Sequence, residues 1–107
     1  MKYRVYWTQG AVADLEEIVA YMSKVRVSTA KSIYQKIKLK CNQLNISPER
    51  CRLVPELQRD GLKNYREIIL APYRVVFKLA ESKVYIIAVI DGRRDIEAII
   101  FNKLLRD

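Results

Sequence analysis

Apolar positions in the first part of the chain follow a period of two residues and then a period of about four. Residues 2–7 alternate polar and large apolar side chains, which predicts a strand. Thr8 is a suitable helix N-cap, and apolar residues recur at helical spacing from there to Met22. A second helix is predicted over residues 28–44, where one stripe holds Ala30, Ile33, Tyr34, Ile37, Cys41 and Leu44.

The second part of the chain is typical of antiparallel strands. Residues 47–61 contain two prolines and a glycine and break all periodicity, so we expect a long connection that can hold a short strand. Strands are predicted at 64–71, 73–79 and 84–90, with Pro72 ending the first. Residues 96–105 are apolar on most sides, and we expect them to form a short helix or tail.

The alternation in residues 73–79 also predicts which side chains face the core. Tyr73, Val75, Phe77 and Leu79 fall on one face of the strand, and Arg74, Val76 and Lys78 fall on the other. A tight turn at residues 81–82 would pair Leu79 with Val84, Lys78 with Tyr85 and Arg74 with Val89.

These elements predict one α+β domain over residues 1–107. Two N-terminal helices should pack on a mostly antiparallel four-stranded sheet in the order strand-helix-helix-strand-strand-strand. The apolar C-terminal segment follows the last strand.

Charge and residue types narrow the function. Twenty Lys and Arg against 12 Asp and Glu give a formal charge of +8, which favours a polyanion or an acidic partner. Histidine is absent and the two cysteines cannot supply the ligands of a structural zinc site, so we expect no metal and no cofactor.

The sequence carries no recognisable export signal and no apolar run near the roughly 20 residues that span a bilayer. A cytoplasmic protein without membrane contact is therefore expected.

Four short blocks of sequence stand in a recognisable order. They are Val54 to Leu57, Tyr65 to Glu67, Tyr73 to Phe77, and Gly92 to Asp95. With the opening strand and first helix, they resemble the RelE/ParE toxin superfamily over nearly the whole chain. The resemblance implies the toxin component of a type II toxin–antitoxin system. It also implies a cognate antitoxin as partner, and a homodimer or a heterotetramer with that antitoxin as the assembly.

Members of the two main branches differ in target. RelE-like members cleave messenger RNA at the ribosome, and ParE-like members poison DNA gyrase. Cleavage of RNA needs a base for the ribose 2′-hydroxyl, cations for the phosphate and an acid for the leaving oxygen. For a ribonuclease, the resemblance assigns the phosphate to Arg74 and Arg94 and the base to Glu56. In either branch, the candidates for binding phosphate or the target are Arg66, Arg74, Arg93 and Arg94.

Two departures from the RelE pattern favour the ParE branch. Ile100 stands where that pattern has an aromatic residue, usually tyrosine, and Ile68 stands where it has a lysine. Isoleucine can neither accept nor donate a proton, so acid or base help would be missing. Glu56 does not discriminate, because the ParE pattern also has a Pro and Glu pair there. We therefore expect a ParE-like toxin that inhibits DNA gyrase by binding it, with a ribosome-dependent messenger-RNA endoribonuclease as the alternative.

Two contacts remain open at the level of sequence. Arg66 shares a sheet face with Arg74 only if their strands pair with an even sum of residue numbers. With an odd sum, Glu67 takes the place beside Arg74 and can form an ordinary cross-strand ion pair worth under about 1 kcal/mol.

The C-terminal segment is too apolar to remain in water, so we expect it to dock on the sheet, on a second copy or on the antitoxin. Its predicted partner-contact residues are Ile96, Ile100, Phe101 and Leu104.

Overall fold

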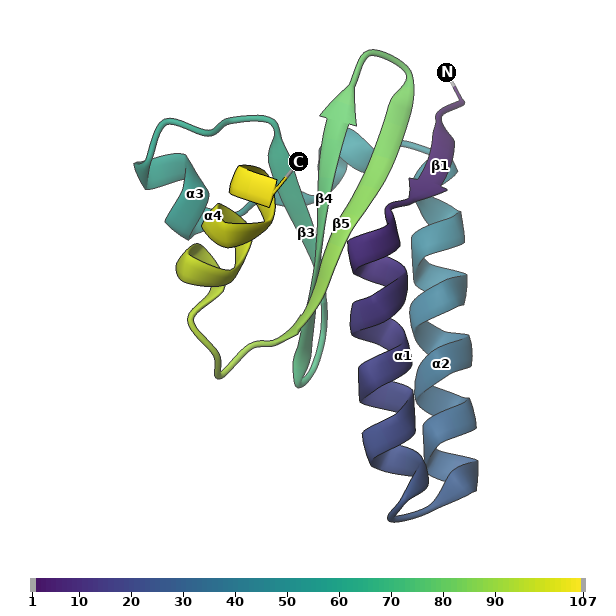
Figure 1. The fold of residues 1–107 in the computed structure, drawn as a ribbon. Coiled ribbons are helices and arrows are strands. Elements are labelled where there is room, and N and C mark those ends of the chain that lie inside the picture. Colours follow the sequence, from purple (N-terminus) through teal and green to yellow (C-terminus); the bar gives the residue numbers. More distant parts are fainter. Residues whose placement is uncertain (1, 107) are drawn as a thin grey trace.

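The computed structural model describes residues 2–106 of the chain, and it shows a sheet between two helical layers (Figure 1). The strands lie in the order β1-β5-β4-β3-β2. The elements in chain order are β1 (Arg4–Trp7), α1 (Gln9–Ser23), α2 (Val27–Asn42), the 3-10 helices η1 (Gln43–Asn45) and η2 (Pro48–Arg50), β2 (Arg52–Leu53), α3 (Pro55–Arg59), β3 (Tyr65–Leu70), β4 (Tyr73–Ala80), β5 (Lys83–Asp91) and α4 (Ile96–Arg106).

Helix α1 is fixed to the sheet by hydrogen bonds near its start. The Thr8 side chain accepts a hydrogen bond from the Ala11 amide at 3.2 Å, which confirms the predicted N-cap. The same hydroxyl donates to the Ile86 carbonyl at 2.7 Å. One turn later, Asp14 accepts from the Val89 amide at 3.0 Å. The beginning of α1 is thereby held against β5.

The α+β class is as predicted, but the sheet has five strands and is mixed. Strand β1 pairs with β5 in parallel, with Tyr6 opposite Tyr85. The prediction of four mostly antiparallel strands was therefore wrong in detail. A parallel neighbour needs a long crossover, and the α1–α2 hairpin belongs to the connection that brings the chain back to the sheet. Strand β2 pairs with β3 at the opposite edge. Its two residues are too few to show a period in the sequence.

The predicted pairing of β4 with β5 holds near the turn and shifts farther along. Leu79 lies opposite Val84 and Lys78 opposite Tyr85, as expected. Arg74 pairs with Ile90 rather than Val89, because the register shifts between Val76 and Phe77. A β-bulge adds one residue on one strand and moves every later pair by one position.

Two cores occupy the two faces of the sheet. Helices α1 and α2 cover the face that carries Val75 and Phe77, both fully buried as the alternation predicted. Helices α3 and α4 cover the other face, where Val76 and Ile100 are fully buried. The C-terminal segment is therefore a helix docked on the sheet. Among residues 2–106, no helix combines the length and the hydropathy that a membrane span requires.

Candidate functional site

Arg74 lies at the centre of a cluster of charged side chains on the α3/α4 face of the sheet. Its Nη1 and Nη2 donate to the two carboxylate oxygens of Glu56 on α3, both at 2.8 Å. Its Nε donates to Glu67 Oε1 at 2.6 Å, and Nη2 reaches Glu67 Oε2 at 3.0 Å. Every nitrogen of the guanidinium is thus occupied by a carboxylate, and Arg74 holds α3 against β3 and β4.

Glu67 is the buried member of this cluster. Its side chain has no exposed surface, whereas that of Arg74 keeps 13%. A second cation reaches the same carboxylate from the edge strand, where Arg52 Nε donates to Glu67 Oε2 at 2.6 Å. Buried carboxylates persist when they are paired and hydrogen-bonded, and Glu67 meets both conditions.

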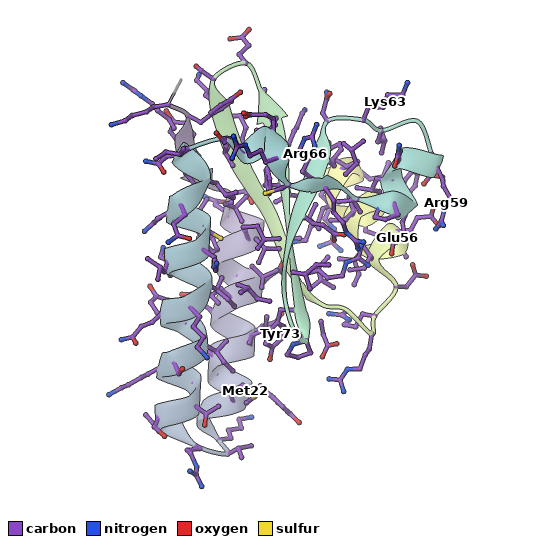
Figure 2. All side chains as sticks on the ribbon, turned by 180° about the vertical axis from the view of Figure 1, so that it is seen from behind. Met22, Glu56, Arg59, Lys63, Arg66 and Tyr73 are labelled. Atoms are coloured by element: carbon purple, nitrogen blue, oxygen red, sulfur yellow. The ribbon has the colours of Figure 1, made fainter. Side chains whose placement is uncertain are left out.

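The pairing of β3 with β4 resolves the placement of Arg66. Ile69 lies opposite Arg74, so the sum of paired residue numbers is odd, and Glu67 is the residue on the face of Arg74. Arg66 points to the other face, where its Nη1 donates to the Cys51 carbonyl at 2.6 Å. Figure 2 shows Arg66 and Glu56 on opposite sides of the sheet. The ion pair of Glu67 is buried and shared, so the surface value of under about 1 kcal/mol does not apply to it.

The charged cluster also sets the protonation state of Glu56. Hydrogen bonds from Arg74 lower the pKa of the Glu56 carboxyl from 4.5 to about 2. The two glutamates in turn raise the pKa of Arg74. A general base is most effective when its pKa lies near the working pH, and Glu56 is far below that range. The carboxylate can bind a cation but is poorly suited to accept a proton.

Gly92 brings the fourth sequence block to the same place. Its amide donates to the Pro72 carbonyl at 2.8 Å. A Cβ at this position would lie 3.2 Å from the Pro72 oxygen and 3.4 Å from Cδ of Arg74. The absence of a side chain at Gly92 therefore lets the strand end pack on the stem of Arg74. Residues from all four blocks, Glu56, Glu67, Arg74 and Gly92, meet in this one cluster.

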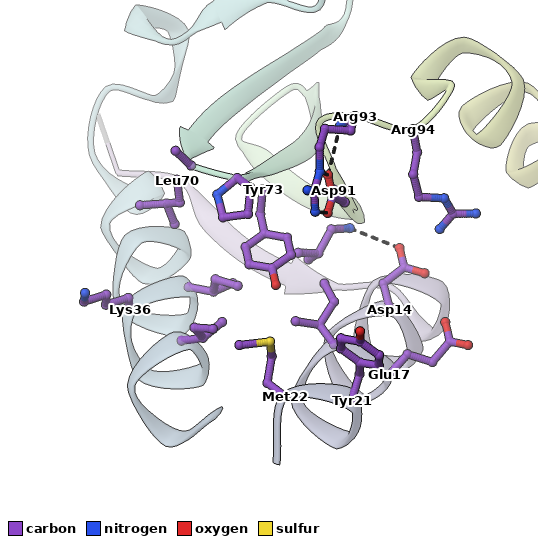
Figure 3. Close-up of a pocket in the computed structure, with 16 residues that line it drawn as sticks. Asp14, Glu17, Tyr21, Met22, Lys36, Leu70, Tyr73, Asp91, Arg93 and Arg94 are labelled. Atoms are coloured by element: carbon purple, nitrogen blue, oxygen red, sulfur yellow. Dashed lines mark hydrogen bonds and ion pairs between the residues drawn. The ribbon is translucent and has the colours of Figure 1, made fainter. Parts of the chain in front are cut away.

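Arg93 and Arg94 lie beside a different feature, a groove of about 740 Å³ between the α1–α2 hairpin and the end of the sheet. Tyr21 and Met22 of α1 approach this groove from one side and Tyr73 of β4 from another (Figure 3). Arg93 is tied to Asp91, with Nε 2.9 Å from Oδ1, and Arg94 is exposed. This groove could not be predicted from the sequence, because its walls come from segments far apart along the chain.

Helix α4 divides the predicted partner-contact residues between the interior and the surface. Ile96 and Ile100 are buried in the core under the helix, and Leu104 packs at the margin of that core. Phe101 is 59% exposed. The helix is tied to α1 by an ion pair between Lys103 Nζ and Asp14 Oδ2 at 3.2 Å. In the folded chain, Phe101 is therefore the member of the predicted set that is open to a partner.

The arrangement offers cations and carboxylates that neutralise one another, with an apolar residue at position 100. Four of the five N–H donors of Arg74 bind carboxylate oxygens, and Ile100 has no proton to give. Among residues 2–106, no group of three or more His, Cys, Asp or Glu side chains could hold a metal ion. The cluster thus joins α3 to the sheet through ion pairs.

The fold is a mixed five-stranded sheet with the α1–α2 hairpin on one face and α3 and α4 on the other. The family model for the ParE toxin of the type II toxin–antitoxin system parDE matches residues 5–96, so the chain belongs to the ParE toxin family. This finding confirms the ParE branch expected from Ile68 and Ile100.

A solved structure has the same fold. It comes from the chromosomal ParDE toxin–antitoxin system of P. aeruginosa, with a TM-score of 0.70 and 18% sequence identity. The match covers 84% of this chain and 96% of that one. No curated protein matches the sequence.

Proposed function

We propose that this chain is a growth-inhibiting toxin that acts by binding DNA gyrase and is neutralised by a cognate antitoxin. Membership of the ParE family supports the toxin and the antitoxin. The observation that carries the mechanism is the state of Arg74, whose guanidinium gives four of its five N–H donors to Glu56 and Glu67. An inhibitor that acts by binding needs a stable surface and no proton transfer.

The alternative is a messenger-RNA endoribonuclease with Arg74 and Arg94 on the phosphate and Glu56 as base. The low pKa of Glu56 and the buried Ile100 count against it. For Arg74 to bind phosphate through two donors, it would have to release one of its carboxylates, either Glu56 or the fully buried Glu67. Release of Glu67 would leave a buried charge at a cost of several kcal/mol. The gyrase mechanism requires no such rearrangement.

Arg93 and Arg94 are the target-binding candidates that remain open to a partner. Both are exposed and lie at the rim of the groove between the helical hairpin and the sheet. Arg66 and Arg74 bind within the chain and are proposed to act only through the fold. For the antitoxin, we place Phe101 and the adjoining margin of α4 among the contacts, in a homodimeric or heterotetrameric assembly.

Expression in bacteria tests this function directly. Induction of the chain alone should stop growth, and plasmids from the arrested cells should lose negative supercoils on chloroquine gels. Expression of the R93A/R94A variant is expected to weaken both effects together. Normal growth with soluble protein in the lysate would refute the toxin function. Arrest with fully supercoiled plasmid would refute the gyrase mechanism.

A further inference from the structure

One part of the α3/α4 face of the sheet lies beyond the end of helix α4. The helix ends below the β4–β5 hairpin (Figure 1), and above it Tyr85 is half-buried at the margin of the core while Tyr6 is exposed. Strand register brings Tyr6, Tyr85 and Lys78 into one row across β1, β5 and β4. Two residues nearer the hairpin, Arg4 of β1 lies beside Lys83 of β5. We call these five residues, Arg4, Tyr6, Lys78, Lys83 and Tyr85, the aromatic–basic patch.

The two tyrosines of the patch form a flat surface at the edge of the sheet. Their rings are stacked, with centroids 5.5 Å apart and planes inclined by 22°. Tyr6 is 39% exposed although it lies in a strand of the sheet. Strand β1 is the last strand on this side of the described sheet, so no further strand covers the stack. A planar ring from a ligand can extend it.

Charge on the patch is of one sign. Arg4 and Lys83 are exposed and Lys78 is partly exposed, and none of the three forms an ion pair among residues 2–106. Glu67, a carboxylate on the same face, is buried and already paired with Arg52 and Arg74. Cations without an ion pair beside stacked tyrosines, one of them exposed, fit a ligand that alternates negative charges with flat rings.

We propose that the aromatic–basic patch binds single-stranded nucleic acid, with bases stacked on Tyr6 and Tyr85 and phosphates near Arg4, Lys78 and Lys83. Single strands suit the site because their bases are free to stack, whereas those of a duplex are covered by their neighbours. An acidic peptide would satisfy the cations but would leave the tyrosine stack unused. The inference does not depend on gyrase binding, since the residues in the patch differ from Arg93, Arg94 and Phe101.

Fluorescence anisotropy of a labelled oligothymidylate of about 12 nucleotides tests the proposal with the purified chain. Tyr6→Ala should weaken binding about 5- to 150-fold, because one stacked base is lost. Tyr6→Phe keeps the ring and should bind as the original does. Tyr21→Ala removes a tyrosine that is 69% exposed on α1, away from the patch, and should also leave binding unchanged.

Salt dependence provides a second test that does not rely on the tyrosines. Lys83→Gln should reduce the slope of log affinity against log salt by about one, whereas Lys31→Gln on α2 should not. Three results would overturn the proposal: equal losses for Tyr6→Ala and Tyr21→Ala, equal affinity for a duplex of the same length, or displacement of the oligonucleotide by an oligoglutamate at equal charge concentration. Each would mean that the net charge of +8, or an acidic peptide, accounts for the binding.

Discussion

Arg74 and the two glutamates around it show how single residues decide between catalysis and structure. The same three side chains could serve an RNA-cleaving site if each were free, but here the guanidinium makes one two-point contact with Glu56 and another with Glu67. Bidentate contacts of this kind are among the strongest that arginine makes. The residues that resemble a catalytic set therefore stabilise the position of α3.

Removal of Arg74 should destabilise the chain strongly. Arg74→Ala leaves the buried Glu67 carboxylate with Arg52 alone, and breaking a buried pair in this way costs about 3–5 kcal/mol. Urea denaturation followed by circular dichroism measures the loss. Arg93→Ala, a matched change of an exposed arginine paired with Asp91, should leave the denaturation midpoint unchanged. Equal midpoints for the two variants would contradict the structural role of Arg74.

Acid should weaken the same cluster in a defined pH range. The pKa of Glu56 falls from 4.5 to about 2 on folding, so the ionised carboxylate stabilises the fold above pH 4.5. That contribution is lost as the pH falls from 4.5 towards 2. Thermal melts across this range should show a shallower decline for Glu56→Gln than for the original chain.

Asp91→Asn is the control for this prediction, because Asp91 is a second carboxyl group whose pKa is lowered. The pKa of Asp91 is also lowered to about 2, through hydrogen bonds with Arg93, but the group lies in a local pair outside the cluster. A decline that flattens in Asp91→Asn and not in Glu56→Gln would contradict the assignment to Glu56.

In helix α4, the sequence predicted that apolar residues dock, and the structure shows which of them face the sheet. Its apolar residues predicted docking, but periodicity alone left open whether they face the sheet or a partner. In the structure, Ile100 is fully buried and its neighbour Phe101 is 59% exposed. Adjacent residues of one helix point in directions about 100° apart, so the two serve different purposes.

Alanine substitutions at these neighbours should have opposite consequences. Ile100→Ala leaves a cavity under α4 and should lower the free energy of unfolding by about 2–5 kcal/mol. Phe101→Ala should change stability by less than about 0.5 kcal/mol and weaken binding of the antitoxin instead. Chemical denaturation and antitoxin titration by calorimetry separate the two effects. A large loss of stability in Phe101→Ala would mean that the helix packs differently.

At the scale of the whole molecule, the sequence pattern predicted local elements better than it predicted the pairing of distant segments. The helices α1 and α2, the Thr8 cap and the β4–β5 turn follow from nearby residues, and all were expected. The parallel position of β1, the register shift between Val76 and Phe77, and the odd pairing sum of β3 and β4 depend on how distant segments meet. The strand pairing brings Glu67 beside Arg74. The four sequence blocks could therefore be recognised, but the contacts between them could not be derived from the sequence.

Parallel assays on the purified chain test most directly whether this ParE-family toxin acts by binding gyrase or by cutting RNA. One assay follows supercoiling of relaxed plasmid by DNA gyrase, and the other follows new 5′ ends on ribosome-bound messenger RNA by primer extension. We predict inhibition of supercoiling and no new 5′ ends. Cuts at the ribosomal A site that disappear in Glu56→Gln or Arg94→Ala, with supercoiling unaffected, would contradict the account.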